Sequence, residues 1–144
     1  MSFFGKLNVV SALYAFVLFI AIELMLNVYR IARVTGWELE IVTKAGIAIY
    51  IIGFIFSTAL FIIITKKWME ARNAIFWSTL LWVPYFVLFI FTFATLFPIN
   101  NPGDEPNPGV GLLIIGALLF YPVYLLFINV FGSGLGITED ENTI

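Results

Sequence analysis

The chain has 144 residues, of which 62% are hydrophobic and 11% are charged, and its formal net charge is −2. Soluble domains carry about 25% charged residues, so this composition predicts a membrane protein. The seven Lys and Arg residues lie near the ends of apolar runs, which argues against nucleic acid as a partner. The sequence has no cysteine and no histidine, so thiol chemistry, the usual metal ligand and the usual general base are missing. We therefore expect no catalytic residues, no metal and no cofactor, and we predict that the protein is not an enzyme.

Four apolar runs follow one another at residues 7–29, 45–65, 73–97 and 110–131. As a helix the first run reaches roughly 34 Å, enough to cross a hydrocarbon core about 30 Å thick. The spans use most of the chain and leave no segment long enough for a separate soluble core. The sequence thus predicts an all-α polytopic membrane protein, a single domain built as a four-transmembrane-helix bundle, with an acidic tail at residues 132–144.

The first run holds Glu23, the only carboxylate inside an apolar segment. Glu23, Asn27 and Arg30 are spaced i, i+4 and i+7, so on a continuous helix they share one face. A charge near mid-membrane costs roughly 2.5 to 3.5 kcal/mol on insertion scales, so such a carboxyl is expected to be protonated, paired or turned to an interior. We predict an intramembrane polar cluster in which Asn27 bridges the other two. Two interpretations of this cluster remain open: Glu23 is part of a structural hydrogen-bonded pair, or it is a titrating group on a transport path.

Small residues mark the second span, where Gly53 and Ser57 form a small-xxx-small pair that lets another helix approach closely. Packing within the chain is the favoured explanation, and a dimer interface is the alternative. Before this span, residues 30–44 mix apolar residues with charges of both signs. We predict an interfacial connector there, with Trp37 at the level of the lipid headgroups.

Two prolines lie inside the third and fourth spans, Pro84 and Pro122. Each removes a backbone donor and is expected to kink its helix, while neighbouring groups satisfy the freed carbonyl. Paired interruptions can mark a transporter site, but an inverted repeat would place one in each half of the chain. Both prolines lie in the second half, so tolerated kinks are the favoured interpretation.

Two loops complete the pattern. Residues 98–109 are rich in proline, asparagine and glycine and contain Asp104 and Glu105. These acids do not have the spacing of a calcium-binding loop, so a solvated turn is favoured over an ion site. The glycine-rich stretch from Gly132 to residue 136 is expected to end the fourth helix.

Orientation follows from the distribution of positive charge, because short cytoplasmic loops are enriched in Lys and Arg. One side carries Lys6, Lys66, Lys67 and Arg72, and the other carries Arg30, Arg33 and Lys44. The count favours cytoplasmic termini, in the cell membrane.

Two functions fit these features. The first is a non-enzymatic accessory, regulatory or protective subunit, which would dock its aromatic third helix on a larger membrane protein. The alternative is an oligomeric small-ion or proton-coupled transporter or channel that uses Glu23. The expected partners are the lipid bilayer and either a membrane protein or further copies of the chain.

Overall fold

The computed structural model describes residues 2–68 and 76–143, with side chains as far as residue 132. These ranges contain no strand, which confirms the all-α class. The helices are α1 (Phe3–Leu26), α2 (Val28–Thr35), α3 (Leu39–Trp68), α4 (Ser78–Leu96) and α5 (Pro108–Thr143), with a short 3-10 helix, η2 (Pro102–Asp104). Four of them are long and apolar enough to cross a membrane: α1, α3, α4 and the Pro108–Gly132 part of α5. The chain is an integral membrane protein.

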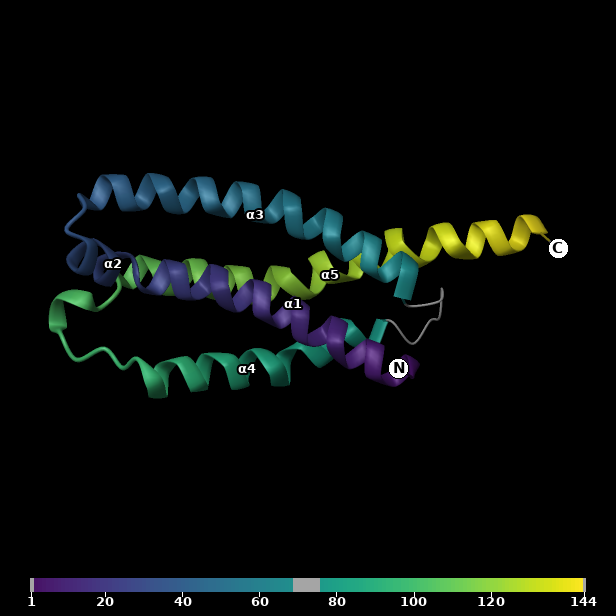
Figure 1. Ribbon diagram of the computed structural model, residues 1–144, viewed down its shortest axis with the longest axis horizontal. Coiled ribbons are helices and arrows are strands. Elements are labelled where there is room, and N and C mark those ends of the chain that lie inside the picture. The colour runs from purple at the N-terminus through teal and green to yellow at the C-terminus, as the bar shows by residue number, and fades with distance from the viewer. Residues whose placement is uncertain (1, 69–75, 144) are drawn as a thin grey trace.

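The long helices run side by side, with α1 and α5 between α3 and α4 (Figure 1). The start of α1, the end of α3 and the start of α4 lie at one end of the bundle, which we call the terminal end. The other end, which we call the loop end, holds α2, the start of α3 and the η2 loop between α4 and α5. The closest pairings are α1 with α4 and α3 with α5.

Helix bounds at the loop end differ from those expected from the sequence. The first long helix stops at Leu26 because Asn27 leaves helical geometry, with φ −110° and ψ 15°. A separate helix, α2, then runs to Thr35, and α3 already begins at Leu39. The predicted connector at residues 30–44 is therefore mostly helical, with a turn at residues 36–38. Gly36 makes that turn with φ 74°, a left-handed conformation that glycine adopts without steric cost.

Gly132 does not end the last helix, because α5 continues to Thr143. Glycine lowers helix stability by about 1 kcal/mol relative to alanine but keeps its backbone hydrogen bonds, so neighbouring turns carry the helix through. Gly132 instead allows α5 and α3 to approach closely, because a Cβ at Gly132 would lie 2.5 Å from Thr65 Cγ2 and 2.7 Å from Thr65 Cβ. The predicted start of the third span, residues 73–75, lies outside the described residues.

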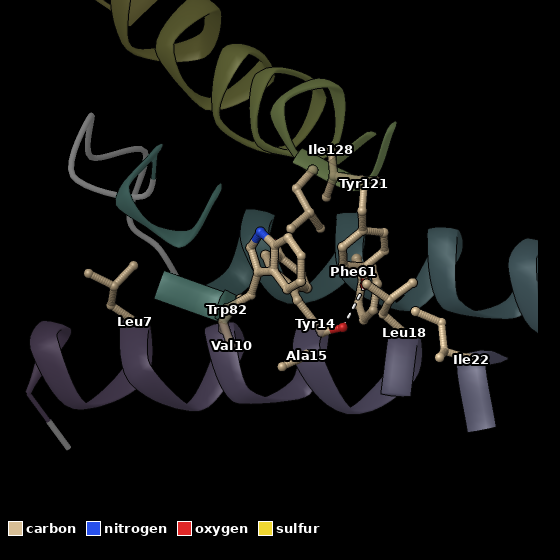
Figure 2. Close-up of a cluster of buried hydrophobic side chains, with 11 residues drawn as sticks. Leu7, Val10, Tyr14, Ala15, Leu18, Ile22, Phe61, Trp82, Tyr121 and Ile128 are labelled. Atoms are coloured by element: carbon tan, nitrogen blue, oxygen red, sulfur yellow. Dashed lines mark hydrogen bonds between the residues drawn. The ribbon is translucent and has the colours of Figure 1, made fainter. Parts of the chain in front are cut away.

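The core joins the two helix pairs through one aromatic ring from each long helix (Figure 2). The rings of Tyr14 and Phe61 meet edge to face with centroids 4.6 Å apart, and Trp82 meets Tyr121 in the same way at 5.1 Å. Lipid tails are as apolar as leucine, so helices in a bilayer associate through such packing and through hydrogen bonds. The core cluster comprises Leu7, Val10, Tyr14, Ala15, Leu18, Ile22, Phe61, Trp82, Tyr121, Leu125 and Ile128.

Both prolines lie within continuous helices, Pro84 in α4 and Pro122 in α5. Pro84 withdraws the backbone donor that would reach the carbonyl four residues earlier. In the same turn the indole N–H of Trp82 donates to the Thr79 carbonyl at 2.8 Å. This bond goes to the carbonyl that precedes that of Leu80, the one from which Pro84 withdraws its helical donor.

Candidate functional site

A buried polar network, formed by Tyr14, Thr65, Ser78 and Asn129, connects the four long helices at the terminal end. The Tyr14 hydroxyl lies 3.1 Å from Thr65 Oγ1 and donates to Asn129 Oδ1 at 3.3 Å. Asn129 Nδ2 donates to Ser78 Oγ at 2.9 Å. None of the four side chains is more than 1% exposed. One residue from each long helix therefore contributes to a single hydrogen-bonded unit inside the bundle.

The chemistry of this network is that of a structural junction. Its members are hydroxyls and one amide, which carry no charge at neutral pH. The Tyr121 hydroxyl adds a bond of 2.6 Å to the Tyr14 carbonyl, drawn as the dashed line in Figure 2. Among the described side chains, no buried nitrogen or oxygen lacks a hydrogen-bond partner. The bonds satisfy polar groups that would be costly to leave unpaired in a low-dielectric interior.

Local sequence pattern assigns no common role to the members of this network. In the sequence, Ser78 is a hydroxyl six residues before Pro84, and Asn129 is a polar residue near the end of the fourth apolar run. The signal that could have found them is the presence of one polar residue per span near the same membrane depth. That signal does not say which helix faces meet.

Glu23 lies three residues before the end of α1 and is half-buried. Asn27 Nδ2 donates to Glu23 Oε2 at 2.9 Å and to the Glu23 carbonyl at 2.7 Å. The structure thus brings these two members of the predicted cluster together.

Arg30, the third member, has other partners. Its guanidinium donates to the Phe97 carbonyl at 3.0 Å and lies 3.8 Å from Asp104 Oδ2. The helix is interrupted at Asn27, so the i+7 relation to Glu23 no longer holds, and an acid in the η2 loop attracts the guanidinium instead.

A second polar feature, the α2–η2 clamp of Arg33 and Asp104, closes the loop end. Arg33 donates two parallel bonds to the Asp104 carboxylate, each 2.8 Å long. Asp104 is only 2% exposed, although it lies at the end of the bundle and not in its centre. The hydrogen bonds from Arg33 hold the pKa of Asp104 below its ordinary value, and the same bonds raise the pKa of Arg33. The two residues are 71 positions apart, so no local pattern could pair them.

The clamp also bears on the ion site considered for this loop. Both Asp104 oxygens accept from Arg33, while Glu105 is exposed. Within the described residues there is no group of three His, Cys, Asp or Glu side chains arranged to hold a metal ion. The loop is built as a salt-bridged turn, in which the Asn101 side chain also accepts from the Gly103 N–H at 2.9 Å.

Two cavities lie where α3 diverges from α1 and α5. The inner cavity, of about 570 Å³, is bordered by α1, α3 and α5. The outer cavity, of about 640 Å³, extends toward the loop end, and Met25 and Tyr50 line both. Glu23 lines neither.

Gly53 and Ser57 border the inner cavity, which differs from the helix contact expected of them. A Cβ added at Gly53 would have nothing within 4 Å, and Ser57 bonds back to the Phe54 carbonyl of its own helix. Within the chain, Gly132 provides the close helix approach.

Comparison with protein-family models, with curated proteins and with solved structures gives no significant match.

Proposed function

We propose that this protein is a non-enzymatic accessory membrane subunit that docks on a larger membrane protein through α4. One observation supports the proposal: the polar clusters described above bond within the chain, whereas the outer side of α4 is apolar. The polar network and the α2–η2 clamp join parts of the chain to each other. What the bundle presents outward along α4 is a rigid apolar face.

The docking face is a stripe of exposed side chains at helical spacing: Leu80, Val83, Val87 and Phe91. α4 is the shortest of the four spanning helices, and its main packing partner in the chain is α1. Trp77, near its start, is 62% exposed. Large aromatic side chains are enriched at the centres of protein interfaces, and here Phe91, which is 69% exposed, and Trp77 provide aromatic surface beside the aliphatic residues.

A photo-crosslinking amino acid at Val87, introduced in native membranes, tests the proposal. We expect a discrete adduct with another membrane protein. The matched control is Ile55, on α3, which is exposed to a similar degree, 65% against 58%. If Val87 gave only lipid adducts, or if gentle extraction recovered the chain by itself, the subunit proposal would be lost.

The alternative, an oligomeric proton-coupled transporter, is favoured by one feature of Glu23. Asn27 bonds to one carboxylate oxygen, and the other has no hydrogen-bond partner among the described residues. A half-exposed carboxyl of this kind can exchange a proton. Proton flux into proteoliposomes should then fall in Glu23→Gln and persist in the control Glu105→Gln. Flux that is the same in wild type and Glu23→Gln would exclude Glu23 as the carrier.

The orientation with both termini in the cytoplasm is part of the proposal. The start of α1 and the exposed residues Lys66 and Lys67 lie together at the terminal end, which supports counting their charges on one side (Figure 1). Arg72, which belongs to the same count, lies outside the described residues. Cysteine labelling from outside intact cells should reach a cysteine at Glu105 and spare one at Lys67. The reverse pattern would invert the orientation.

A further inference from the structure

The two cavities form one groove between α3 and its neighbours α1 and α5. The groove is closed toward the terminal end and open toward the loop end. Near the terminal end, Thr65 touches Gly132, the Thr58 hydroxyl lies 2.6 Å from the Tyr124 hydroxyl, and the rings of Phe54 and Tyr124 lie 5.4 Å apart. From Ser57 and Tyr124 toward the loop end, facing residues of α3 and α5 line the cavities. The α3 helix therefore separates from its neighbours toward the loop end, as Figure 1 also shows.

Polarity changes along the groove. In the inner cavity, Ser57, Tyr121 and Tyr124 all have hydrogen bonds within the chain. The remaining lining there is apolar apart from Tyr50, at the junction of the two cavities. The inner cavity thus offers hydrocarbon contact and almost no polar group for a ligand.

The outer cavity offers hydrogen bonds. The hydroxyls of Tyr29, Thr43 and Tyr50 have no hydrogen-bond partner among the described residues. Asn107 also lines this cavity, with its amide oxygen bonded to the Gly109 N–H at 2.9 Å and its amide nitrogen without a partner among the described residues. Among the described residues, no charged side chain lines either cavity. Two pairs of charged residues near the groove bond to each other, Lys44 with Glu40 at 2.8 Å and Arg33 with Asp104.

From this gradient we infer that the groove binds one uncharged amphiphile of the bilayer, with its acyl chain in the inner cavity and a hydroxyl- or ester-bearing head, such as that of a monoacylglycerol, in the outer cavity. The inner cavity is apolar and therefore excludes water. Left empty, it would forfeit the dispersion contacts of every atom that lines it. A molecule supplied by the surrounding lipid fills it without either cost.

The size of the groove suits a lipid chain and its head. The inner cavity measures about 570 Å³ and the outer cavity about 640 Å³. These are volumes typical of small-molecule sites, which span roughly 300 to 1,000 Å³. The inference is independent of the docking face on α4, which lies on another helix.

Two leucine substitutions in the full chain give a matched test. Gly53→Leu projects a side chain into the inner cavity, where an added Cβ meets nothing within 4 Å. Gly116→Leu also enters open space but lies outside the lining of both cavities. Both changes favour helix formation, so both variants are expected to fold.

The probe is 1-monooleoylglycerol, measured by native mass spectrometry of the protein released from nanodiscs. We expect wild type and Gly116→Leu to retain one molecule. Binding to Gly53→Leu should be weaker by about tenfold or more, because the new side chain displaces at least two buried methylene groups of the ligand. Equal retention by Gly53→Leu and Gly116→Leu would overturn the inference, since lipid bound around the protein would then explain it.

The head is tested separately with oleate, which has the same chain and a charged head. We expect wild type to prefer monooleoylglycerol, and the double variant Thr43→Val, Tyr50→Phe to lose that preference. Oleate binding as tightly as monooleoylglycerol to wild type would contradict the assignment of an uncharged head. A lipid-free dimer that Gly53→Leu abolishes would show that a second copy fills the groove, and would also overturn the inference.

Discussion

The two ends of the bundle are held together by different physical means. At the terminal end, uncharged side chains from four helices bond to one another deep in the core, and α3 meets α5 without space for a Cβ at Gly132. At the loop end, a charged pair, Arg33 and Asp104, ties α2 to η2, and α3 stands away from α1 and α5. Charged groups are favourable at the end of a bundle, where water can hydrate them. Hydrogen bonds between neutral groups are favourable in the interior. The difference separates a rigid junction from a groove that can accept a ligand.

The largest expected effect is at Gly132. Gly132→Ala places a Cβ against Thr65, and overpacking of this kind costs typically about 1 to 3 kcal/mol. We expect a clear loss of stability against denaturation by detergent. The control is Gly116→Ala, where the added Cβ meets nothing within 4 Å and helix propensity should raise stability by about 0.5 to 1 kcal/mol. Similar effects at the two glycines would contradict a tight junction at the terminal end.

Asn129 comes next. Asn129→Leu keeps the branching of the side chain, with methyl groups in place of the amide oxygen and nitrogen, and removes the bonds to Tyr14 and Ser78. Hydrogen bonds between membrane helices contribute about 0.6 kcal/mol on average and up to about 1.7, so we expect a loss of about 1 to 2 kcal/mol in the same denaturation assay. Thr95→Val, which removes only an exposed bond within α4, is the control. A loss no greater than that of the control would show that the network contributes nothing to stability.

Asp104→Asn should act locally at the other end. It weakens the paired bonds to Arg33 without touching the core, so we expect faster hydrogen exchange in residues 98–107 and little change in global unfolding. Glu105→Gln, at the exposed neighbour, is the control. Global unfolding that shifts as much as in Gly132→Ala would mean that the two ends are not separate.

Acid should reproduce the effect of Asp104→Asn in the wild type. Arg33 lowers the pKa of Asp104 in the folded protein, so the clamp contributes stability above the ordinary aspartate pKa of about 3.9. That contribution is lost as the pH falls through the lowered pKa. Hydrogen exchange in residues 98–107, corrected for its intrinsic pH dependence, should rise only in strong acid in the wild type. In Asp104→Asn this additional rise should be absent, and a rise near neutral pH would contradict the assignment.

The smallest expected effect is at Glu23. Glu23→Gln keeps an oxygen that can accept from Asn27, so stability should change by no more than about 0.5 kcal/mol. Asn27→Leu removes the donor and should cost more. The opposite order, measured by detergent denaturation, would show that the charge on Glu23 is part of the fold.

The sequence was sufficient for what depends on local pattern. Length and hydropathy predicted four spanning helices, and the spacing of Glu23 and Asn27 placed them on one face. The sequence led to a wrong prediction at Gly132, because glycine has two structural roles. Glycine ends helices and also permits close packing, and only the position of Thr65 shows that Gly132 does the second. The pairing of Arg33 with Asp104, and of Tyr14 with Asn129, depends on which helix faces meet, and no local pattern contains that information.

Distances between spin labels on α3 and α5 test the central claim most directly, and the absence of cysteine makes labelling specific. One pair, Lys66 and Phe131, reports on the terminal end, and the other, Ala45 and Leu112, on the loop end. We predict a short, narrow distribution for the first pair and a longer, broader one for the second, which narrows when monooleoylglycerol is added. Equal and narrow distributions at both ends, unchanged by the lipid, would mean that α3 runs parallel to α5 and that no groove exists.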